Sequence, residues 1–553
     1  MLNTSDKTCA IAVLAAVAVA IFLTAPLQSD YWWSDTPRHA MDGLFYLDLL
    51  RAMPIHDPKA WALAYYAQYP ALTVGFYPPL GHLAFALGYA LFGVGHAVAI
   101  GVVAVFFFTL LCGVFALGRI AVARRAASHV LSPWAATLAA LTGAILVAAS
   151  PQMLLWGQQA MLDIPALAWA TWAAVFLLLY AERERPRDLA LFAVFALSAL
   201  YTKQTMAMPL AGAAAGLLLA RGSVRQAFGL LRRRHFWIIA AIATVALIPL
   251  ALLQLRFAAY NLVNVESRPD LGDVPSRASL AGLAWYATHA PASFGWPLIL
   301  LGAAGLGLGA IRRPALPIVL GWLVVAYLVL TGIALKEERH GLTLAVPLGV
   351  FASGTVALLL GRAARRGWAP VAAGAVAVVA SVGAFAAVLV QGPTPTLTGY
   401  RQAAETVMRD MPAGGRILFS GNRDAAFTAD VRFMDPDRKF TVVRVDKLFL
   451  HVAVQPGLGL HPRDLSQDEV SATLDRYGIQ YVVSEPNLWL SAPVMKRFDD
   501  VLHSPQFQEV GRVPVRGPVA EKELVIYRNL HPPPDKPEGG TPEIMGGFVS
   551  TGP

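Results

Sequence analysis

A short polar segment follows the first apolar run of this sequence and carries residues that can do acid–base chemistry. The segment YWWSDTPRHAMDG contains Asp35, Arg38, His39 and Asp42. A carboxylate can take a proton from a hydroxyl group, and an arginine can hold a phosphate and stabilise the charge that develops as the phosphate leaves. These residue types suit a reaction in which a hydroxyl displaces a phosphate. The simpler interpretation is a solvated loop in which Asp35 caps a helix that begins near Pro37.

Three further polar groups stand at the ends of apolar segments. Asp163 lies in MLDIPALAW, Lys203 lies in ALYTKQTMAM, and LKEERHG places Arg339 and His340 in one turn. Ionisable groups at the ends of membrane helices are functional candidates by default. Each group also has a simpler explanation: Asp163 as a helix cap, Lys203 as a side chain that extends to the membrane surface, and the last pair as an ordinary charged turn.

The composition indicates whether these polar groups belong to a soluble protein or to a membrane protein. The chain has 553 residues, of which 56% are hydrophobic and 14% charged, whereas soluble domains carry about 25% charged residues. The sequence therefore predicts a polytopic membrane protein. In such a protein the net charge of +9 reports membrane topology rather than nucleic-acid binding. The 2 cysteines, Cys9 and Cys112, both lie in apolar segments and predict neither a disulfide framework nor a metal site.

Apolar segments recur along the first 391 residues. A spanning helix needs about 20 mostly apolar residues, and we identify eleven candidates: 9–26, 96–118, 131–149, 163–181, 187–202, 205–221, 236–255, 294–311, 314–334, 341–361 and 369–391. The first follows Lys7, as a cleavable signal peptide would. The sequence LTAPLQSD after it lacks a small-x-small cleavage site, so we predict that it remains as a helix.

The positions of basic residues predict the orientation. Arginines cluster in alternate connections between the apolar segments, in ARR, ERERPR, RGSVRQAFGLLRRRH, IRR and RAARR. Because basic loops favour the cytoplasm, the N-terminus is predicted to be cytoplasmic and residues 28–95 to form a large outer loop. Residues 78–95 of this loop are apolar but short for a span, which is typical of an interfacial or re-entrant helix.

The composition changes after residue 392. A Pro/Thr/Gly-rich linker, QGPTPTLTGYRQ, leads to RILFS, KFTVVRV, IQYVVSE and ELVIYRN, which read as strands, and to predicted helices near 400–411 and 466–477. The glycines of PAGGRILFSGN precede a strand and do not predict a nucleotide site. We predict an α-helical membrane protein with about 11 spanning helices, residues 1–392, a small extracytoplasmic α/β domain, residues 393–530, and a disordered tail, residues 531–553.

Five motifs of this sequence resemble one known family. DTPRHA resembles the D-E-x-R-Y-A signature of a group of GT-C glycosyltransferases. This group is the protein O-mannosyltransferase and aminoarabinose transferase superfamily, which is similar to glycosyltransferase family 39. FYPPLGHLAFALGYALFGVGHAVA is similar to its P-P-L element, and MLDIPALAWATWAAVFLLL to its D-x-P helix. ALSALYTKQTMAMPL resembles its T-K hairpin, and EERHGLTLAVPLGVFA its K-x-x-R-Y segment. The resemblance covers residues 10–365 in the family's order.

The resemblance implies an inverting transferase that moves a sugar from a polyprenyl phosphate to an acceptor outside the cytoplasmic membrane. It implies that Asp35 is the catalytic base, that Asp163 is a second acidic catalytic position, and that Arg38 and Lys203 contact the donor. His82, Arg339 and His340 are the further groups expected to bind substrate. A bacterial inner membrane is expected, with the outer loops and the C-terminal domain in the periplasm.

The sequence departs from the family pattern at four positions. Thr36 and His39 replace a glutamate and a tyrosine, while Phe76 and Tyr77 stand where many members carry Glu-Lys. Tyr77 can donate a hydrogen bond to the donor but supplies no positive charge. His39 and Tyr77 are therefore also predicted to bind substrate.

The expected partners are a polyprenyl-phosphate-linked sugar, an acceptor protein, lipid or glycan, and membrane lipids. No cofactor, metal or nucleic acid is expected. One alternative is a transporter or flippase of a lipid-linked substrate, although such proteins usually place ionisable groups near the bilayer midplane. Another is an assembly subunit whose α/β domain does the work, which would leave Asp35 and Arg38 without a role.

Overall fold

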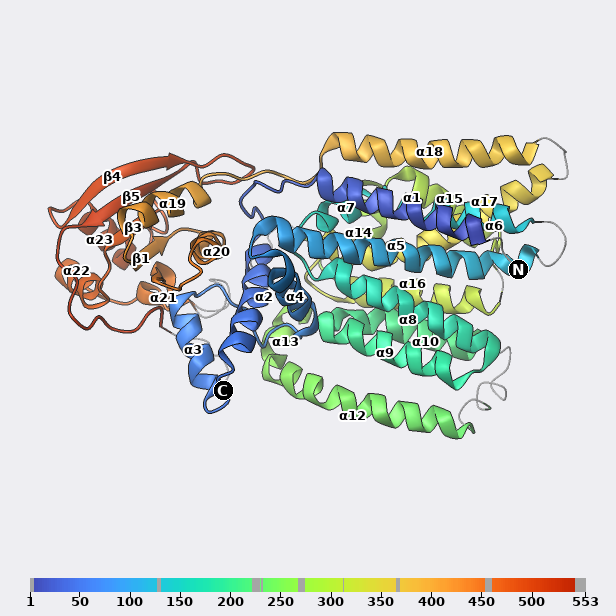
Figure 1. Ribbon diagram of the computed structural model, residues 1–553, viewed down its shortest axis with the longest axis horizontal. Coiled ribbons are helices and arrows are strands. Elements are labelled where there is room, and N and C mark those ends of the chain that lie inside the picture. Colours follow the sequence, from blue (N-terminus) through green and yellow to red (C-terminus); the bar gives the residue numbers. More distant parts are fainter. Residues whose placement is uncertain are drawn as a thin grey trace. The chain divides into compact units, whose positions relative to one another are not determined.

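The computed structural model describes residues 4–126, 131–220, 229, 232–266, 274–311, 313–364, 369–452 and 460–542. The chain forms two compact units (Figure 1). Unit 1 comprises Met1–Ala25, Gly75–Gly81 and Ile100–Thr394, and unit 2 comprises Pro26–Val74, His82–Ala99 and Pro395–Pro553. Much of the arginine-rich connection after residue 220, predicted to be cytoplasmic, lies outside the described residues.

Unit 1 is built from helices. All eleven apolar segments predicted from the sequence coincide with helices, because a long apolar run satisfies its backbone hydrogen bonds most simply as a helix. The helices are α1 (Thr4–Leu23), α5 (His96–Ala126), α6 (Pro133–Ala148), α7 (Pro151–Gly157), α8 (Asp163–Arg183), α9 (Pro186–Thr202), η1 (Gln204–Met206), α10 (Ala207–Ala220), α12 (Arg234–Arg256), α13 (Ala258–Glu266), α14 (Leu280–Phe294), α15 (Trp296–Gly307), α16 (Ala315–Gly332), η3 (Glu338–Leu344), α17 (Ala345–Ala364) and α18 (Ala369–Gln391).

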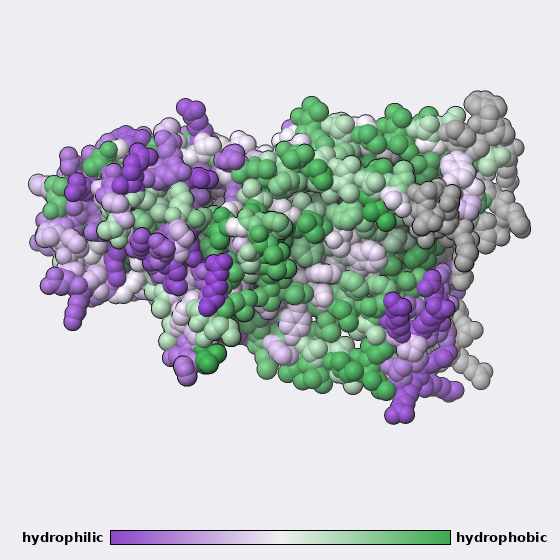
Figure 2. Space-filling view, in the orientation of Figure 1, coloured by the Kyte–Doolittle hydropathy of each residue, from purple (hydrophilic) through white to green (hydrophobic). Residues whose placement is uncertain are grey.

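Helix lengths vary more than the sequence suggested. Within the described ranges, 6 helices are long and apolar enough to cross a membrane, or 7 if α6 and α7, which are bent by 69°, form one span. Shorter apolar helices include Thr8–Leu23, Gln204–Ala220 and Trp296–Gly307. The surface of these helices is largely hydrophobic (Figure 2), as lipid contact requires. The chain is thus a helical membrane protein, and the count of eleven spans stays a prediction.

Small residues bring α10 and α16 into close contact. A Cβ atom added at Gly212 would lie 2.3 Å from the carbonyl oxygen of Gly321, and one added at Gly216 would clash with the carbonyl oxygen of Pro317. Gly212 and Gly216 are four residues apart, so both lie on the same face of α10. This small-xxx-small spacing allows backbones to approach where no hydrophobic force between helices is available.

Unit 2 contains a five-stranded mixed sheet. Its strands are β1 (Gly415–Ser420), β2 (Phe440–Arg444), β3 (Tyr481–Ser484), β4 (Phe507–Pro514) and β5 (Glu523–Asn529). They follow the order β2-β1-β3-β5-β4, in which β2, β1 and β3 run parallel, whereas β5 pairs antiparallel with β3 and β4. The four predicted strands are confirmed as β1, β2, β3 and β5, and the sequence analysis missed β4.

Hydrophobic cores cover both faces of this sheet. Helices α19 (Tyr400–Asp410) and α20 (Asp424–Met434) contribute to one core, while α21 (Val445–Phe449), α22 (Gln467–Arg476) and α23 (Pro493–Leu502) contribute to the other. Alternating side chains of β1 enter the two cores: Leu418 in one, Ile417 and Phe419 in the other. Such alternation is expected of a strand that is buried on both faces. The predicted helices near 400–411 and 466–477 are confirmed as α19 and α22.

Most of the predicted outer loop, residues 28–74 and 82–95, belongs to the same unit as this sheet, a grouping that the sequence analysis did not anticipate. It supplies α2 (Asp35–Ala52), α3 (Pro58–Gln68) and most of α4 (Leu80–Phe92). Leu87, Leu91 and Phe92 of α4 are exposed while Phe85 and Tyr89 are buried, which fits the predicted interfacial helix.

The predicted disordered tail is described in part. Residues 531–542 are placed, and Thr541 is buried, with its backbone N–H donating to the carbonyl oxygen of Ala67. The described part of the tail therefore packs within unit 2. Residues 543–553 lie outside the described residues.

Candidate functional site

The nine predicted site residues fall into two groups, one in each unit. Unit 1 holds Tyr77, Asp163, Lys203, Arg339 and His340, and unit 2 holds Asp35, Arg38, His39 and His82.

The central contact of the unit 1 group is a buried ion pair. The ammonium group of Lys203 donates to Oδ1 of Asp163 over 2.7 Å, and the side chains are only 6% and 8% exposed. Asp163 is the first residue of α8, whose N-cap position is occupied by Leu162, and Lys203 is the extended residue between α9 and η1. Asp163 is therefore not an N-cap, and Lys203 does not reach to the surface. Oδ2 of Asp163 is buried without a hydrogen-bond partner among the described residues.

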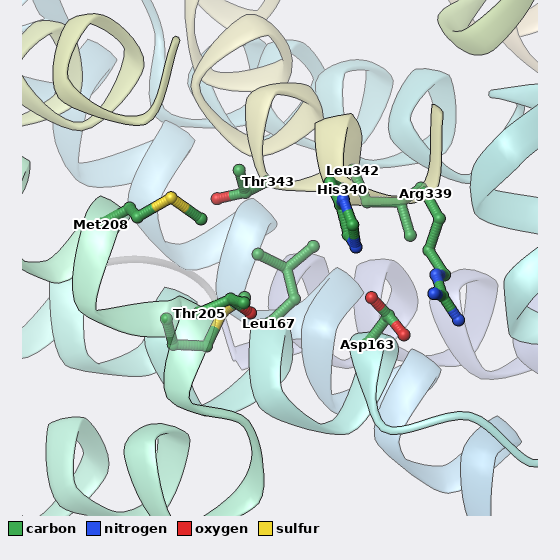
Figure 3. A pocket seen from close by; sticks show the side chains of 9 residues that line it. Asp163, Leu167, Thr205, Met208, Arg339, His340, Leu342 and Thr343 are labelled. Carbon is green, nitrogen blue, oxygen red and sulfur yellow. The ribbon is translucent and has the colours of Figure 1, made fainter. Parts of the chain in front are cut away.

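Arg339 and His340 lie beside Asp163 at the start of η3. A small cavity of about 10 Å³ is lined by Asp163, Arg339 and His340 together with apolar and threonine side chains. His340 and Arg339 both extend toward the Asp163 carboxylate from the opposite wall (Figure 3). Arg339 also pairs with Glu337 over 2.9 Å and lies over the Trp156 ring. The structure thus brings two cationic groups and one imidazole to one buried carboxylate.

Tyr77 lies in unit 1 but apart from this cavity, whose lining residues do not include it. Its ring meets the edge of Phe76 at 4.8 Å between centroids. Phe76 in turn packs against Phe257 and Tyr260. The two residues that replace the family's Glu-Lys thus belong to an aromatic cluster.

In unit 2, Asp35 is the first residue of α2, and Ser34 occupies the N-cap position. The helix therefore begins two residues before Pro37, and the interpretation of Asp35 as its cap is wrong. Asp35 is half-buried. A negative charge in the first turn interacts favourably with the helix dipole.

Arg38, one turn further along α2, belongs to a network of charges. Its guanidinium donates to both carboxylate oxygens of Asp424 at 3.0 and 3.1 Å. Asp424 also pairs with Arg444 over 2.6 Å, and Arg444 pairs with Asp446. Burial, aided by the positive charge of Arg444, lowers the pKa of the adjoining Lys447 to about 7. The sequence analysis missed these partners, and no local signal points to them.

His39 and His82 meet in the interior of unit 2. Nδ1 of His39 lies 3.1 Å from Nε2 of His82, which is 3.5 Å from Oδ2 of Asp42. Thr73 donates to both oxygens of Asp42, through its backbone N–H at 2.9 Å and its hydroxyl at 2.5 Å. Burial raises the pKa of Asp42 to about 7, although the hydrogen bonds from Thr73 oppose the shift. Asp42 was visible beside His39 in the sequence but had been given no role.

Each group, taken by itself, contains residues suited to acid–base or phosphate chemistry. Asp35 is a partly accessible carboxylate that can accept a proton. Lys203 and Arg339 are cations in a low-dielectric interior, where their interaction with a phosphate is stronger than in water.

A family model matches part of the chain. Residues 77–253 match the family model described as dolichyl-phosphate-mannose-protein mannosyltransferase. A comparison with curated protein sequences found no match.

Solved structures match most of the chain. The crystal structure of ArnT from Cupriavidus metallidurans bound to undecaprenyl phosphate has a TM-score of 0.62 and 15% sequence identity, and the match covers 95% of this chain and 99% of that one. The oligosaccharyltransferase AglB from Archaeoglobus fulgidus, in complex with an inhibitory peptide and a dolichol-phosphate, has a TM-score of 0.51 at 13% identity, covering 86% of this chain and 69% of that one. The family match covers only part of the chain, whereas the structural matches show that nearly the whole chain shares the fold of the ArnT and AglB structures.

Proposed function

We propose that this protein is an inverting glycosyltransferase that moves a sugar from a polyprenyl-phosphate donor to an acceptor hydroxyl at the outer face of a bacterial inner membrane. The observation that carries the proposal is the first turn of α2, which bears the half-buried carboxylate of Asp35 and the guanidinium of Arg38 in a chain of GT-C fold. The ArnT and AglB structures, which contain undecaprenyl phosphate and a dolichol-phosphate, support a lipid phosphate as the donor's leaving group.

The proposed reaction is a single displacement. The acceptor oxygen forms a bond to the anomeric carbon of the sugar while the bond from that carbon to the phosphate oxygen breaks. The acceptor proton passes to Asp35, and the electron pair leaves with the lipid phosphate. Holding both substrates in one orientation supplies much of the rate, because it removes entropy from the encounter.

The unit 1 group is assigned to the donor. Lys203 and Arg339 balance the charge of the phosphate, and His340 donates a hydrogen bond. Asp163 holds the ammonium group of Lys203 in place over 2.7 Å, and its unpartnered Oδ2 is available to a sugar hydroxyl. For unit 2, the proposal keeps Arg38 as a substrate contact, made in exchange for part of its hydrogen bonding to Asp424.

The decisive experiment is a transfer assay on membranes that contain the full chain, using a panel of radiolabelled polyprenyl-phosphate sugars and the endogenous acceptors. We expect one donor to be turned over by the wild type. The Asp35→Asn variant should bind this donor and lose transfer by at least about 100-fold, which is the low end of what a general base contributes.

Asp57→Asn is the matched control on the same outer loop. Asp57 caps α3 by accepting from the backbone N–H of Ala60, and asparagine is an equally good cap. This variant should retain transfer. Full activity in Asp35→Asn would overturn the assignment of the base. Movement of a lipid-linked sugar across the membrane without transfer would replace the proposal by a transporter.

A further inference from the structure

Two histidines and an aspartate converge in the interior of unit 2. The ligand-capable atoms of His39, Asp42 and His82 all lie within 4.8 Å of one another. All three side chains are at most 1% exposed. We propose that these residues form a binding site for a divalent cation of the zinc class, which joins α2 to α4.

The two separations that involve Nε2 of His82 fit a coordination shell. Zinc binds histidine nitrogens and carboxylate oxygens at 2.0–2.2 Å, so two ligands of a tetrahedral ion lie about 3.3 Å apart. His82 Nε2 is 3.1 Å from His39 Nδ1 and 3.5 Å from Asp42 Oδ2. A pair of imidazoles with one carboxylate is a donor set that zinc uses.

Hydrogen bonding alone accounts for the cluster less well. A ring nitrogen carries either one hydrogen or one lone pair, so Nε2 of His82 can make one hydrogen bond, yet it faces two ligand atoms. Nδ1 of His82 has no hydrogen-bond partner among the described residues. Among the described residues, the ring thus makes its polar contacts through Nε2, where a bound cation would engage all three residues at once.

Neighbouring residues orient the Asp42 carboxylate and allow α2 and α4 to pack closely. Thr73 donates two hydrogen bonds to Asp42, and outer partners of this kind orient metal-binding carboxylates. A Cβ atom added at Gly43 would lie 2.5 Å from Cβ of Phe85. The glycine thus lets α2 approach α4 closely enough for His39 to meet His82.

This inference does not depend on the proposed glycosyltransferase activity. Because the three residues are completely buried, the cation is proposed to have a structural role that links α2 to α4. It is not proposed to contact substrate. His39 follows Arg38 directly, so the cation would also fix the orientation of the α2 turn that carries Asp35 and Arg38. The sequence analysis expected no metal; Asp42 and His82, which are 40 positions apart in the chain, meet only in the folded structure.

The first test measures metal in the purified full-length chain by inductively coupled plasma mass spectrometry. We expect close to one zinc per chain, or uptake of one Zn²⁺ after chelation and dialysis. We also expect a rise in unfolding temperature when Zn²⁺ is returned, because a ligand that binds only the folded state stabilises it. No stoichiometric zinc, together with no shift on titration with Zn²⁺, Mn²⁺ or Co²⁺, would overturn the proposal.

Variants locate the site. His39→Gln and Asp42→Asn should each lose stoichiometric zinc, and Thr73→Val should retain it with about 10-fold lower affinity, the low end for loss of an outer partner. His96→Gln is the matched control, since His96 is another histidine of unit 2 whose Nδ1 contacts the carbonyl oxygen of Ser29. It should keep the full zinc content.

A spectroscopic measurement on the wild-type chain tests the site even if the ligand variants fail to fold. Co²⁺ bound by the wild-type chain should give the visible absorption of a tetrahedral site with nitrogen and oxygen ligands, and His96→Gln should give the same spectrum. Zinc retained equally by Asp42→Asn and the wild type would place the ion elsewhere and contradict the assignment.

Discussion

Arg38 of α2 donates two hydrogen bonds to the carboxylate of Asp424, the first residue of α20, although 386 positions separate them in the chain. The same carboxylate pairs with Arg444, which also pairs with Asp446. The helix that carries the proposed catalytic base is thus fixed by charges of the C-terminal half of the chain. If Arg38 binds substrate as proposed, that substrate has to compete with Asp424.

Replacing Asp424 by asparagine should destabilise the folded chain. The change leaves Arg38 without its carboxylate, while Arg444 keeps Asp446. Loss of one partner from a buried pair costs about 3 kcal/mol, which intrinsic fluorescence can follow during chemical unfolding in detergent. Asp437→Asn is the control, because Asp437 pairs with Lys439 at the surface, 67% exposed, and such pairs contribute about 0.5 kcal/mol. If Asp424→Asn and Asp437→Asn lower the free energy of unfolding equally, the charge network around Asp424 does not stabilise the chain more than a surface ion pair does.

The Asp163–Lys203 pair allows structural and functional roles to be separated. Asp163→Asn and Lys203→Gln should each destabilise the chain by about 3 kcal/mol, since each leaves a buried charge without its partner at 2.7 Å. The double variant removes both charges and should recover most of the stability, as judged from its unfolding temperature. Transfer activity should stay lost in the double variant. Recovery of activity along with stability would reduce the pair to a structural role.

Lys447 should make stability depend on pH above neutrality. The unfolded chain keeps this lysine protonated up to its ordinary pKa of 10.5, whereas burial lowers the pKa to about 7 in the folded chain. Between these values the unfolded state binds more protons, so the free energy of unfolding rises with pH. Lys447→Met should flatten this rise between pH 7 and 10, measured by chemical unfolding at each pH. The exposed Lys439→Met is the control and should leave the rise unchanged.

Close packing of α10 on α16 predicts a strict size limit at Gly216. A valine side chain there would clash with the backbone of Pro317, and overpacking costs about 2 kcal/mol. Gly216→Val should therefore lower the unfolding temperature of the detergent-solubilised chain. Gly332→Ala is the control, because a Cβ atom at Gly332, the last residue of α16, meets nothing within 4 Å. An unchanged unfolding temperature in Gly216→Val would show that the two helices separate easily.

The sequence by itself determined the secondary structure of most of this protein. Apolar runs and alternating strands are local patterns, and a local pattern suffices to decide whether a segment forms a helix or a buried strand. All eleven apolar segments are helices, and four of the five strands were predicted. The missed strand β4 lies at the edge of the sheet and is mostly exposed, so its sequence, FQEVGRVP, lacks a clear apolar alternation.

Only the tertiary structure decided which polar groups meet. The sequence named Asp163 and Lys203, yet their 2.7 Å contact depends on how α8 packs beside the end of α9. Asp424 had no role until folding placed it against Arg38. Contacts between residues far apart in the chain arise from the packing of whole elements, such as the approach of α2 and α4 at Gly43. No local pattern encodes them, because they depend on the shapes of surfaces that form only when the chain has folded.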